Sequence, residues 1–123
     1  MINEVSTGID IIEISRIKKA VASWDSAFLN RVYTRSELDI CKSSPASLAG
    51  RFAAKEAVLK AINSSQLTCN WREIEILASA SGRPLLKIHG NMASAYKEKR
   101  CQGIDVSISH CRDYAVAVAV ARC

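Results

Sequence analysis

The chain has little of what marks several specialised classes of protein. Its 123 residues include only two prolines and 6% aromatic residues, and they contain no internal repeat and no low-complexity segment. The lack of repeats excludes a repeat architecture, and a content of 49% hydrophobic and 24% charged residues excludes global disorder. The length suits one domain built around one hydrophobic core. We expect a single domain over residues 1–123.

Cysteines at metal-binding spacing are also lacking. The five cysteines are odd in number, and no two of them are spaced as C-x-x-C. A structural zinc site usually needs clustered ligands, and a disulfide framework usually has an even count. We therefore expect free thiols in a reducing compartment. The cysteines are Cys41, Cys69, Cys101, Cys111 and Cys123.

Targeting and membrane-spanning patterns are absent as well. No basic region followed by an apolar run opens the sequence, so no signal peptide is predicted. The apolar run at residues 115–121 is too short to cross a bilayer as a helix. These patterns predict a cytoplasmic protein that does not use a membrane.

The formal net charge of +5 leaves two interpretations open. The charge can serve solubility, or it can attract an anionic partner such as nucleic acid, a phosphate-rich small molecule or an acidic protein. A small RNA-binding domain would interleave basic residues with aromatic ones on its surface. The low aromatic content argues against that alternative, so we expect no nucleic-acid partner.

The pattern of apolar residues predicts an α+β domain. Residues 5–11 alternate as a strand does, and a helix follows with Ile14, Ile17, Val21 and Trp24 on one stripe. Further strands are predicted at residues 73–78, 85–88, 104–109 and 114–121, with a turn at residues 81–84 and a short helix at residues 91–100.

The strand at residues 114–121 alternates valine with alanine, so both of its faces are apolar. It is therefore predicted to be a central strand covered by helices. Thr34 and Glu37 have capping-box spacing and predict the start of a short helix, and Pro45 separates it from a longer helix at residues 47–63. The whole is a mostly antiparallel sheet packed against a long buried helix.

The long helix carries charges where an apolar surface is expected. Apolar residues form a stripe from Leu48 to Ile62, and an alanine ladder at positions 49, 53, 57 and 61 permits close approach of a neighbouring element. Lys55 lies within the stripe, and Arg51 lies one turn away. Glu56 and Lys60 can pair with each other, which leaves Arg51 and Lys55 without an evident partner. An unpaired buried cation is costly, so we expect these two cations to meet an anion.

A second carboxylate lies near the end of the first strand. Asp10 follows Gly8, a placement typical both of a helix N-cap and of a functional site. Magnesium is usually held by one or two carboxylates together with waters and substrate phosphates. If Asp10 and Glu56 met among the cations, they would form a magnesium–pyrophosphate site, but their spacing in the sequence does not show that they meet.

Five segments of the sequence form one further pattern. Residues 8–17 read G-x-D-x-x-x-x-x-R-I, and residues 51–61 read R-F-A-x-K-E-A-x-x-K-A. Residues 106–110 read V-S-I-S-H at a strand end, residues 82–84 form a G-(K/R)-P turn, and residues 34–38 read T-x-x-E-L at a helix start. In these five segments, and in their order over nearly the whole chain, the sequence resembles the short, bacterial type of 4'-phosphopantetheinyl transferase, the holo-(acyl-carrier-protein) synthases.

The resemblance implies a reaction and a set of site residues. Coenzyme A would donate its 4'-phosphopantetheine arm to a serine of an acyl carrier protein for fatty acid biosynthesis, giving 3',5'-ADP. Asp10 and Glu56 would bind Mg²⁺, with Lys60 beside the pyrophosphate. The remaining contacts with coenzyme A would come from Arg51, Lys55, Gly82, Arg83, Pro84 and His110.

The resemblance also implies partners. Arg16 would contact the acidic carrier protein, and Lys18, Lys19 and Arg31 could extend a basic face. Taken singly, each lysine is interpreted as part of an ordinary solvated face. The family's short members form homotrimers with coenzyme A bound between subunits. A carrier domain of a polyketide or peptide synthase is the alternative acceptor.

Two histidines and one loop need separate interpretation. A lone histidine at a strand end is commonly structural; the V-S-I-S-H context assigns His110 to coenzyme A, whereas His89 has no such context and is taken as structural. Many relatives carry a G-T-G loop after the long helix, but residues 61–66 contain no glycine. The path of the loop, and with it the pantetheine channel, is expected to differ here.

Overall fold

A computed structural model of the chain describes residues 4–62 and 70–123. The elements follow in the order β1 (Val5–Glu13), α1 (Ile14–Val32), α2 (Arg35–Cys41), α3 (Pro45–Ile62), the 3₁₀ helix η1 (Trp71–Glu73), β2 (Ile74–Ala78), β3 (Pro84–Ile88), α4 (Gly90–Glu98), β4 (Gly103–His110) and β5 (Tyr114–Arg122). The predicted α+β class is confirmed, and every predicted element is present. In the described part, no helix is both long and apolar enough to span a membrane.

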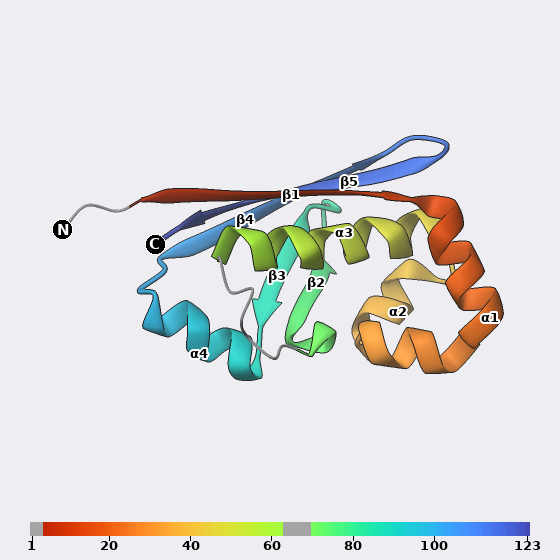
Figure 1. Cartoon of the computed structure of the whole chain (residues 1–123), viewed down its shortest axis with the longest axis horizontal. Coiled ribbons are helices and arrows are strands. Elements are labelled where there is room, and N and C mark those ends of the chain that lie inside the picture. The colour runs from red at the N-terminus through yellow and green to blue at the C-terminus, as the bar shows by residue number, and fades with distance from the viewer. Residues whose placement is uncertain (1–3, 63–69) are drawn as a thin grey trace.

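The strands form two antiparallel sheets. One has the order β1-β5-β4, and the other is the β2–β3 hairpin. The long helix α3 packs against β1, β5 and β4, with the hairpin on its far side and α1 and α2 at one end (Figure 1). The predicted central position of β5 is confirmed, because it pairs with β1 on one side and with β4 on the other.

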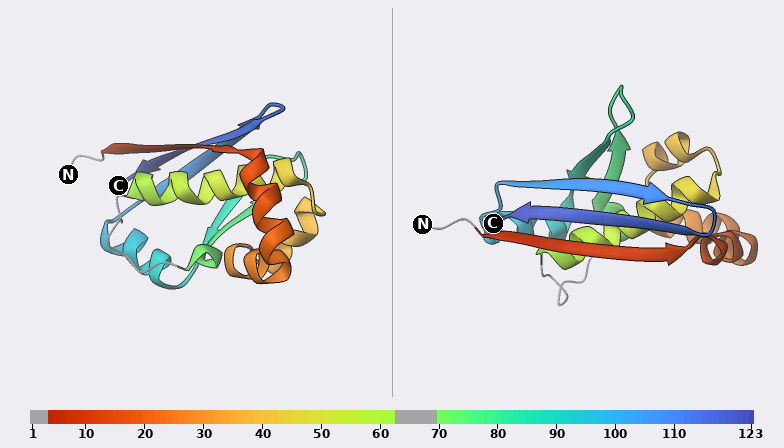
Figure 2. Two further views of the ribbon diagram at one scale, coloured as in Figure 1. Left: turned by 45° about the vertical axis from the view of Figure 1, so that its right-hand side comes forward. Right: turned by 90° about the horizontal axis from the view of Figure 1, so that it is seen from above.

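The alternation of alanine and valine in β5 places small side chains on one face of the strand and larger side chains on the other. Its alanines point toward α3 and are almost completely buried, whereas Val120 on the other face is 40% exposed. By register, Ile9 and Ile11 of β1 lie on the same outer face as Val116 and Val118. Within the described residues no helix lies over this outer face (Figure 2). The prediction that helices cover both faces of β5 is therefore wrong, since α3 covers only the alanine face.

The helix α3 is largely buried, as predicted, because it lies between the two sheets. Ten of its 18 residues are buried, and the alanine ladder belongs to this set. The neighbouring helix α1 departs from its predicted stripe. Ile14 and Ile17 are buried, but non-helical dihedral angles at Asp25 (φ 46°) interrupt the helix, and Trp24 is 69% exposed. The placement of Trp24 on the buried stripe is therefore wrong.

The cysteine prediction also needs correction. Cys101 and Cys123 form a disulfide that links the residues flanking β4 and β5. Antiparallel pairing of these strands places Gly103 opposite Arg122, which brings the two distant cysteines together. Cys41 and Cys111 are free thiols. Cys69 and the glycine-free segment at residues 63–66 lie outside the described residues.

Candidate active site

Two glycines bring α3 unusually close to the three-stranded sheet. A Cβ atom added to Gly8 would lie 2.0 Å from the carbonyl oxygen of Ala57 and 2.7 Å from the backbone nitrogen of Ala61. A Cβ added to Gly50 would lie 2.8 Å from a methyl carbon of Ile108. Only glycine permits such contact between strand and helix. Residues that flank Gly8 on β1 therefore lie directly against the second half of α3.

Asp10 and Lys60 meet across this contact. Lys60 Nζ donates a hydrogen bond to Asp10 Oδ1 at 3.2 Å and another to the Ile9 carbonyl oxygen at 2.9 Å. The Asp10 side chain is 19% exposed, and that of Lys60 is 53% exposed. The helix α1 begins four residues after Asp10, with Glu13 as its N-cap residue. Asp10 is therefore not the N-cap, and the site interpretation remains.

Glu56 belongs to the same group of charges. Partial burial raises the pKa of Glu56, the negative charge of Asp10 raises it further, and Lys60 lowers it. Two carboxylates that repel each other at a half-buried position are stabilised by a bound cation. The structure thus brings Asp10, Glu56 and Lys60 together, which the sequence spacing could not show.

The carboxylates of Asp10 and Glu56 fit Mg²⁺ as part of its ligand shell. Carboxylate oxygens are the hard ligands that Mg²⁺ prefers, and this ion usually keeps several water ligands and binds substrate phosphates as well. In the described ranges, no group of three or more His, Cys, Asp or Glu side chains is arranged to hold a metal. Two carboxylates therefore provide a partial shell, which a phosphate-bearing substrate would complete.

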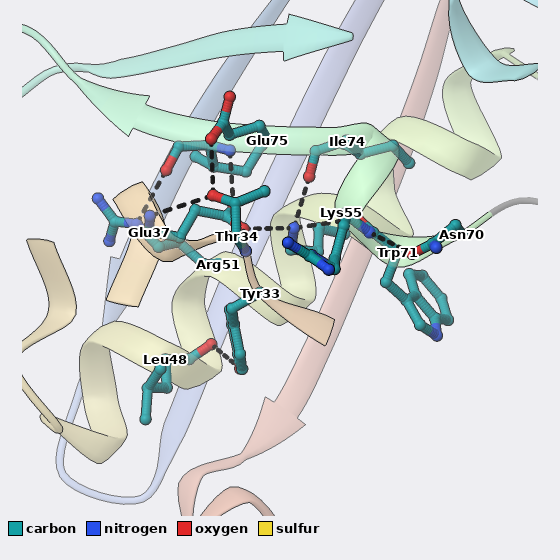
Figure 3. Close-up of polar contacts among 12 residues, drawn as sticks. Tyr33, Thr34, Glu37, Leu48, Arg51, Lys55, Asn70, Trp71, Ile74 and Glu75 are labelled. Carbon is teal, nitrogen blue, oxygen red and sulfur yellow. Dashed lines mark hydrogen bonds and ion pairs between the residues drawn. The ribbon is translucent and has the colours of Figure 1, made fainter. Parts of the chain in front are cut away.

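Lys55 lies on another side of α3, and the expectation that it has no protein anion as a partner is wrong. Its side chain is fully buried and pairs with Glu37, with Nζ 2.8 Å from Oε1 (Figure 3). The ammonium also donates to the carbonyl oxygens of Trp71 (3.1 Å) and Ile74 (2.5 Å). Lys55 thus has a protein anion, and its assigned contact with a phosphate of coenzyme A has no support in this geometry.

Arg51 is half-buried and forms hydrogen bonds to β2 and to a residue of its own helix. Its Nε donates to the carbonyl oxygen of Ile76 at 3.0 Å, and its Nη1 donates to Ser47 Oγ at 3.1 Å. These bonds hold the side chain against β2 (Figure 3). Neither acceptor carries a charge, so the guanidinium can still attract an anion.

The other predicted coenzyme A residues lie in two separate regions, the turn between β2 and β3 and the turn that follows β4. Gly82 and Arg83 are exposed in the β2–β3 turn, where Gly82 has a φ of +90° and Ser79 accepts from the Gly82 backbone. His110 is exposed at the end of β4. Among the described residues, no hydrogen bond or ion pair joins either turn to Asp10. Pro84, the first residue of β3, belongs with the first turn.

Arg16 lies on the first turn of α1 and is exposed. Because α1 follows β1 directly, Arg16 is only six positions beyond Asp10 in the chain. Farther along α1, the change of direction at Asp25 forms a groove of about 440 Å³. This groove, which we call the α1 groove, is lined by Ala20, Trp24, Ala27, Phe28 and Arg31.

Sequence reasoning identified Glu37 only as a capping residue. The capping box with Thr34 is confirmed, but the carboxylate of Glu37 is also fully buried against Lys55 and the Ile76 backbone. An apolar stripe interrupted by one lysine signalled that an anion was needed. Nothing in the pattern showed which carboxylate supplies it. His89 pairs with Glu75 at 3.1 Å, in keeping with its structural interpretation.

Residues 6–119 match the family model of the 4'-phosphopantetheinyl transferase superfamily. The chain belongs to this family.

Individual relatives are similar over nearly their full length. A holo-[acyl-carrier-protein] synthase of Dehalococcoides mccartyi (strain ATCC BAA-2266) is 47% identical over 116 residues, which cover 94% of this chain and 97% of the relative. The crystal structure of Helicobacter pylori holo-[acyl-carrier-protein] synthase in complex with coenzyme A is 35% identical, with a TM-score of 0.83 and coverage of 94% and 98%. A Chronobacterium ammoniagenes synthase–coenzyme A complex is 29% identical, with a TM-score of 0.82 and 97% coverage of both chains.

Proposed function

We propose that this protein transfers the 4'-phosphopantetheine group of coenzyme A to a serine of apo acyl carrier protein, releasing 3',5'-ADP. The observation that carries the proposal is the ion pair of Lys60 and Asp10 between α3 and β1, with the Glu56 carboxylate close enough for both charges to shift its pKa. The family membership and the coenzyme A complexes of similar proteins support the same reaction.

The proposed reaction requires the site to stabilise negative charge. The serine hydroxyl attacks the β-phosphorus while the bond to the leaving 3',5'-ADP breaks, so charge builds on the phosphate oxygens. Mg²⁺ held by Asp10 and Glu56 would neutralise part of this charge. Lys60 adds a positive charge fixed by its bonds to β1, and preorganised charges of this kind are a major source of catalysis.

Coenzyme A would be held by groups on three elements. We assign its phosphates to Arg51 and His110, and its adenine-nucleotide end to the turn of Gly82, Arg83 and Pro84. Lys55 is left out of this set because its ammonium is buried on Glu37.

The carrier protein would dock on α1. Arg16 is exposed on the first turn of α1, which follows β1 directly, and Arg31 lines the α1 groove together with the exposed Trp24. Acidic groups on the carrier would pair with these cations, and an apolar carrier side chain would fill the groove. The expected cytoplasmic location accords with both substrates being soluble.

We also propose that the protein assembles as a homotrimer through the outer face of the three-stranded sheet. Ile9 is 63% exposed and Ile11 is 64% exposed on that face, and exposed apolar surface of this extent often marks an interface. His110 ends β4 in the three-stranded sheet, whereas the β2–β3 turn belongs to the other sheet. An assembly could bring such turns from neighbouring copies to one coenzyme A molecule.

The reaction is tested by the mass of the carrier. Purified protein is incubated with apo acyl carrier protein, coenzyme A and MgCl₂, with and without EDTA. We expect the carrier to gain the mass of one phosphopantetheine group, and EDTA to prevent the gain.

The Glu56→Gln variant separates chemistry from folding. It should abolish transfer while circular dichroism shows an unchanged fold. Normal transfer by this variant would contradict the metal assignment. A carrier domain from a polyketide or peptide synthase, offered in parallel, tests the alternative acceptor.

A further inference from the structure

Glu37 and Lys55 form the most deeply buried charge pair in the described part of the chain, and the proposed reaction does not use them. Both side chains are 0% exposed. Glu37 lies on α2, and Lys55 lies on α3 directly before Glu56 (Figure 3).

The hydrogen bonding of the pair ties four elements together. Lys55 Nζ donates to Glu37, to η1 at Trp71 and to β2 at Ile74. The carboxylate of Glu37 accepts from the backbone nitrogens of Thr34 (2.9 Å) and Ile76 (2.8 Å). These contacts connect α2, α3, η1 and β2 through directional bonds.

Such a pair is not explained by stability. Removing two charges from water costs about as much as their attraction returns, and apolar residues of similar volume often stabilise a fold equally well or better. A role in orientation accounts for the pair more directly, because hydrogen bonds fix direction and apolar contacts do not.

On the opposite side of α3, the directional bonds are those of the half-exposed Lys60 to Ile9 and Asp10, and the alanine packing itself supplies little orientation. Alanines of α3, such as Ala57 and Ala61, pack on the alanine face of β5 and on Gly8. Small residues allow close approach but present few projections that interlock, so shape alone resists rotation or sliding of the helix weakly.

The rotation of α3 decides where Glu56 points. Successive residues of an α-helix are separated by about 100° around its axis, so Lys55 and Ala57 face nearly opposite sides and Glu56 lies between them. Ala57 is held against Gly8 of β1, and Lys55 is held by Glu37 on the other side.

From these contacts we infer that the Glu37–Lys55 pair is a positioning device for the active site. It fixes the rotation and axial position of α3, and thereby the placement of Glu56 and Lys60 against Asp10. Neither residue of the pair contacts substrate. The inference rests on the proposed function for its effect on transfer, but its effect on cation binding can be measured without transfer.

The test removes both charges together. The Glu37→Gln/Lys55→Met double variant keeps the approximate volumes and leaves no unpaired buried charge. Mn²⁺ affinity is measured by electron paramagnetic resonance in the absence of coenzyme A, and kcat and the KM for coenzyme A are measured with apo carrier protein. We expect kcat to fall on the order of 10- to 100-fold, as displaced catalytic groups do, with weaker Mn²⁺ binding and a nearly unchanged KM.

A matched control separates positioning from loss of stability. Met92 is fully buried in α4, and none of the described hydrogen bonds or ion pairs joins it to Asp10, Glu56 or Lys60. Met92→Ala should lower the free energy of unfolding but preserve Mn²⁺ affinity and kcat below its unfolding temperature. Equal loss of Mn²⁺ affinity in this control would overturn the inference, since it would show a merely structural effect.

A second variant keeps the test decisive if the double variant does not fold. Glu37→Asp retains both charges but shortens the carboxylate arm, so it should fold and still misplace α3. Wild-type Mn²⁺ affinity and kcat in whichever variant folds would overturn the inference. If the wild-type protein transfers nothing, the proposed function fails, and the Mn²⁺ comparison alone decides the positioning role.

Discussion

Asp10 and Glu56 bring two negative charges together at a half-buried position where Lys60 compensates only part of them. Burial and the charge of Asp10 raise the pKa of Glu56. In the interval between the ordinary glutamate pKa and this raised value, the folded protein holds more protons than the unfolded chain. The free energy of unfolding therefore falls as pH rises through that interval. The arrangement costs stability in return for cation binding.

This cost predicts that Glu56→Gln stabilises the protein while abolishing transfer. Without metal at neutral pH, we expect the variant to unfold at a temperature on the order of 1–3 °C above that of the wild type. The difference should vanish below the ordinary glutamate pKa, where Glu56 is protonated in both states. Scanning calorimetry across pH checks this. A lower unfolding temperature at neutral pH would contradict the assigned repulsion.

Gly8 controls the distance between Asp10 and α3. A methyl group at this position would overlap the backbone of Ala57, so Gly8→Ala should lower the free energy of unfolding by about 2–3 kcal/mol or more. Urea denaturation measures the loss. Gly103→Ala is the matched control, since a Cβ there meets nothing within 4 Å. Similar losses in both variants would show that the close approach at Gly8 is not the cause.

At the scale of elements, the two faces of β5 have different tasks. The alanine face receives α3, whereas the outer face of the sheet is left open by the protomer and is our proposed trimer interface. Val120 is 40% exposed on this face, and Ile40 on α2 is 38% exposed, so the two residues differ mainly in location.

These residues give a controlled test of assembly. By light scattering coupled to size-exclusion chromatography, we expect the wild type and Ile40→Lys to be trimers. Val120→Lys should be a folded monomer, because a buried unpaired ammonium opposes association. A trimeric Val120→Lys variant would place the interface elsewhere.

At the scale of the whole molecule, the Cys101–Cys123 disulfide closes one end of the β4–β5 pair across a separation of 22 residues. Cross-links of this length typically stabilise by about 2–4 kcal/mol, mainly by restricting the unfolded chain. Cys123→Ser should lose stability of this order under non-reducing conditions, whereas Cys111→Ser, which alters an exposed free thiol, should not.

Peptide mapping without reductant provides the direct check on this bond. A linked pair of peptides containing Cys101 and Cys123 is expected. The bond would be contradicted if this linked pair were absent from protein purified without reductant and the two serine variants were equally stable. The expectation of free thiols, which the odd number of cysteines indicated, would then stand.

The sequence by itself determined the elements, because each rests on local chemistry. Period-two alternation produced β1 and β5, the capping box of Thr34 and Glu37 produced α2, and the apolar circumference of α3 predicted its burial. The candidate residues Asp10, Glu56 and Lys60 were also selected from the sequence, through a family pattern that spans the chain.

Only the tertiary structure decided which charges meet. Lys60 pairs with Asp10, and Lys55 pairs with Glu37, although the two lysines are five residues apart on one helix. The same holds for the open face of β5 and for the Cys101–Cys123 bond. Each depends on the relative placement of residues distant in the chain, which hydrophobic periodicity does not encode, because a pattern specifies that a face is buried but not what buries it.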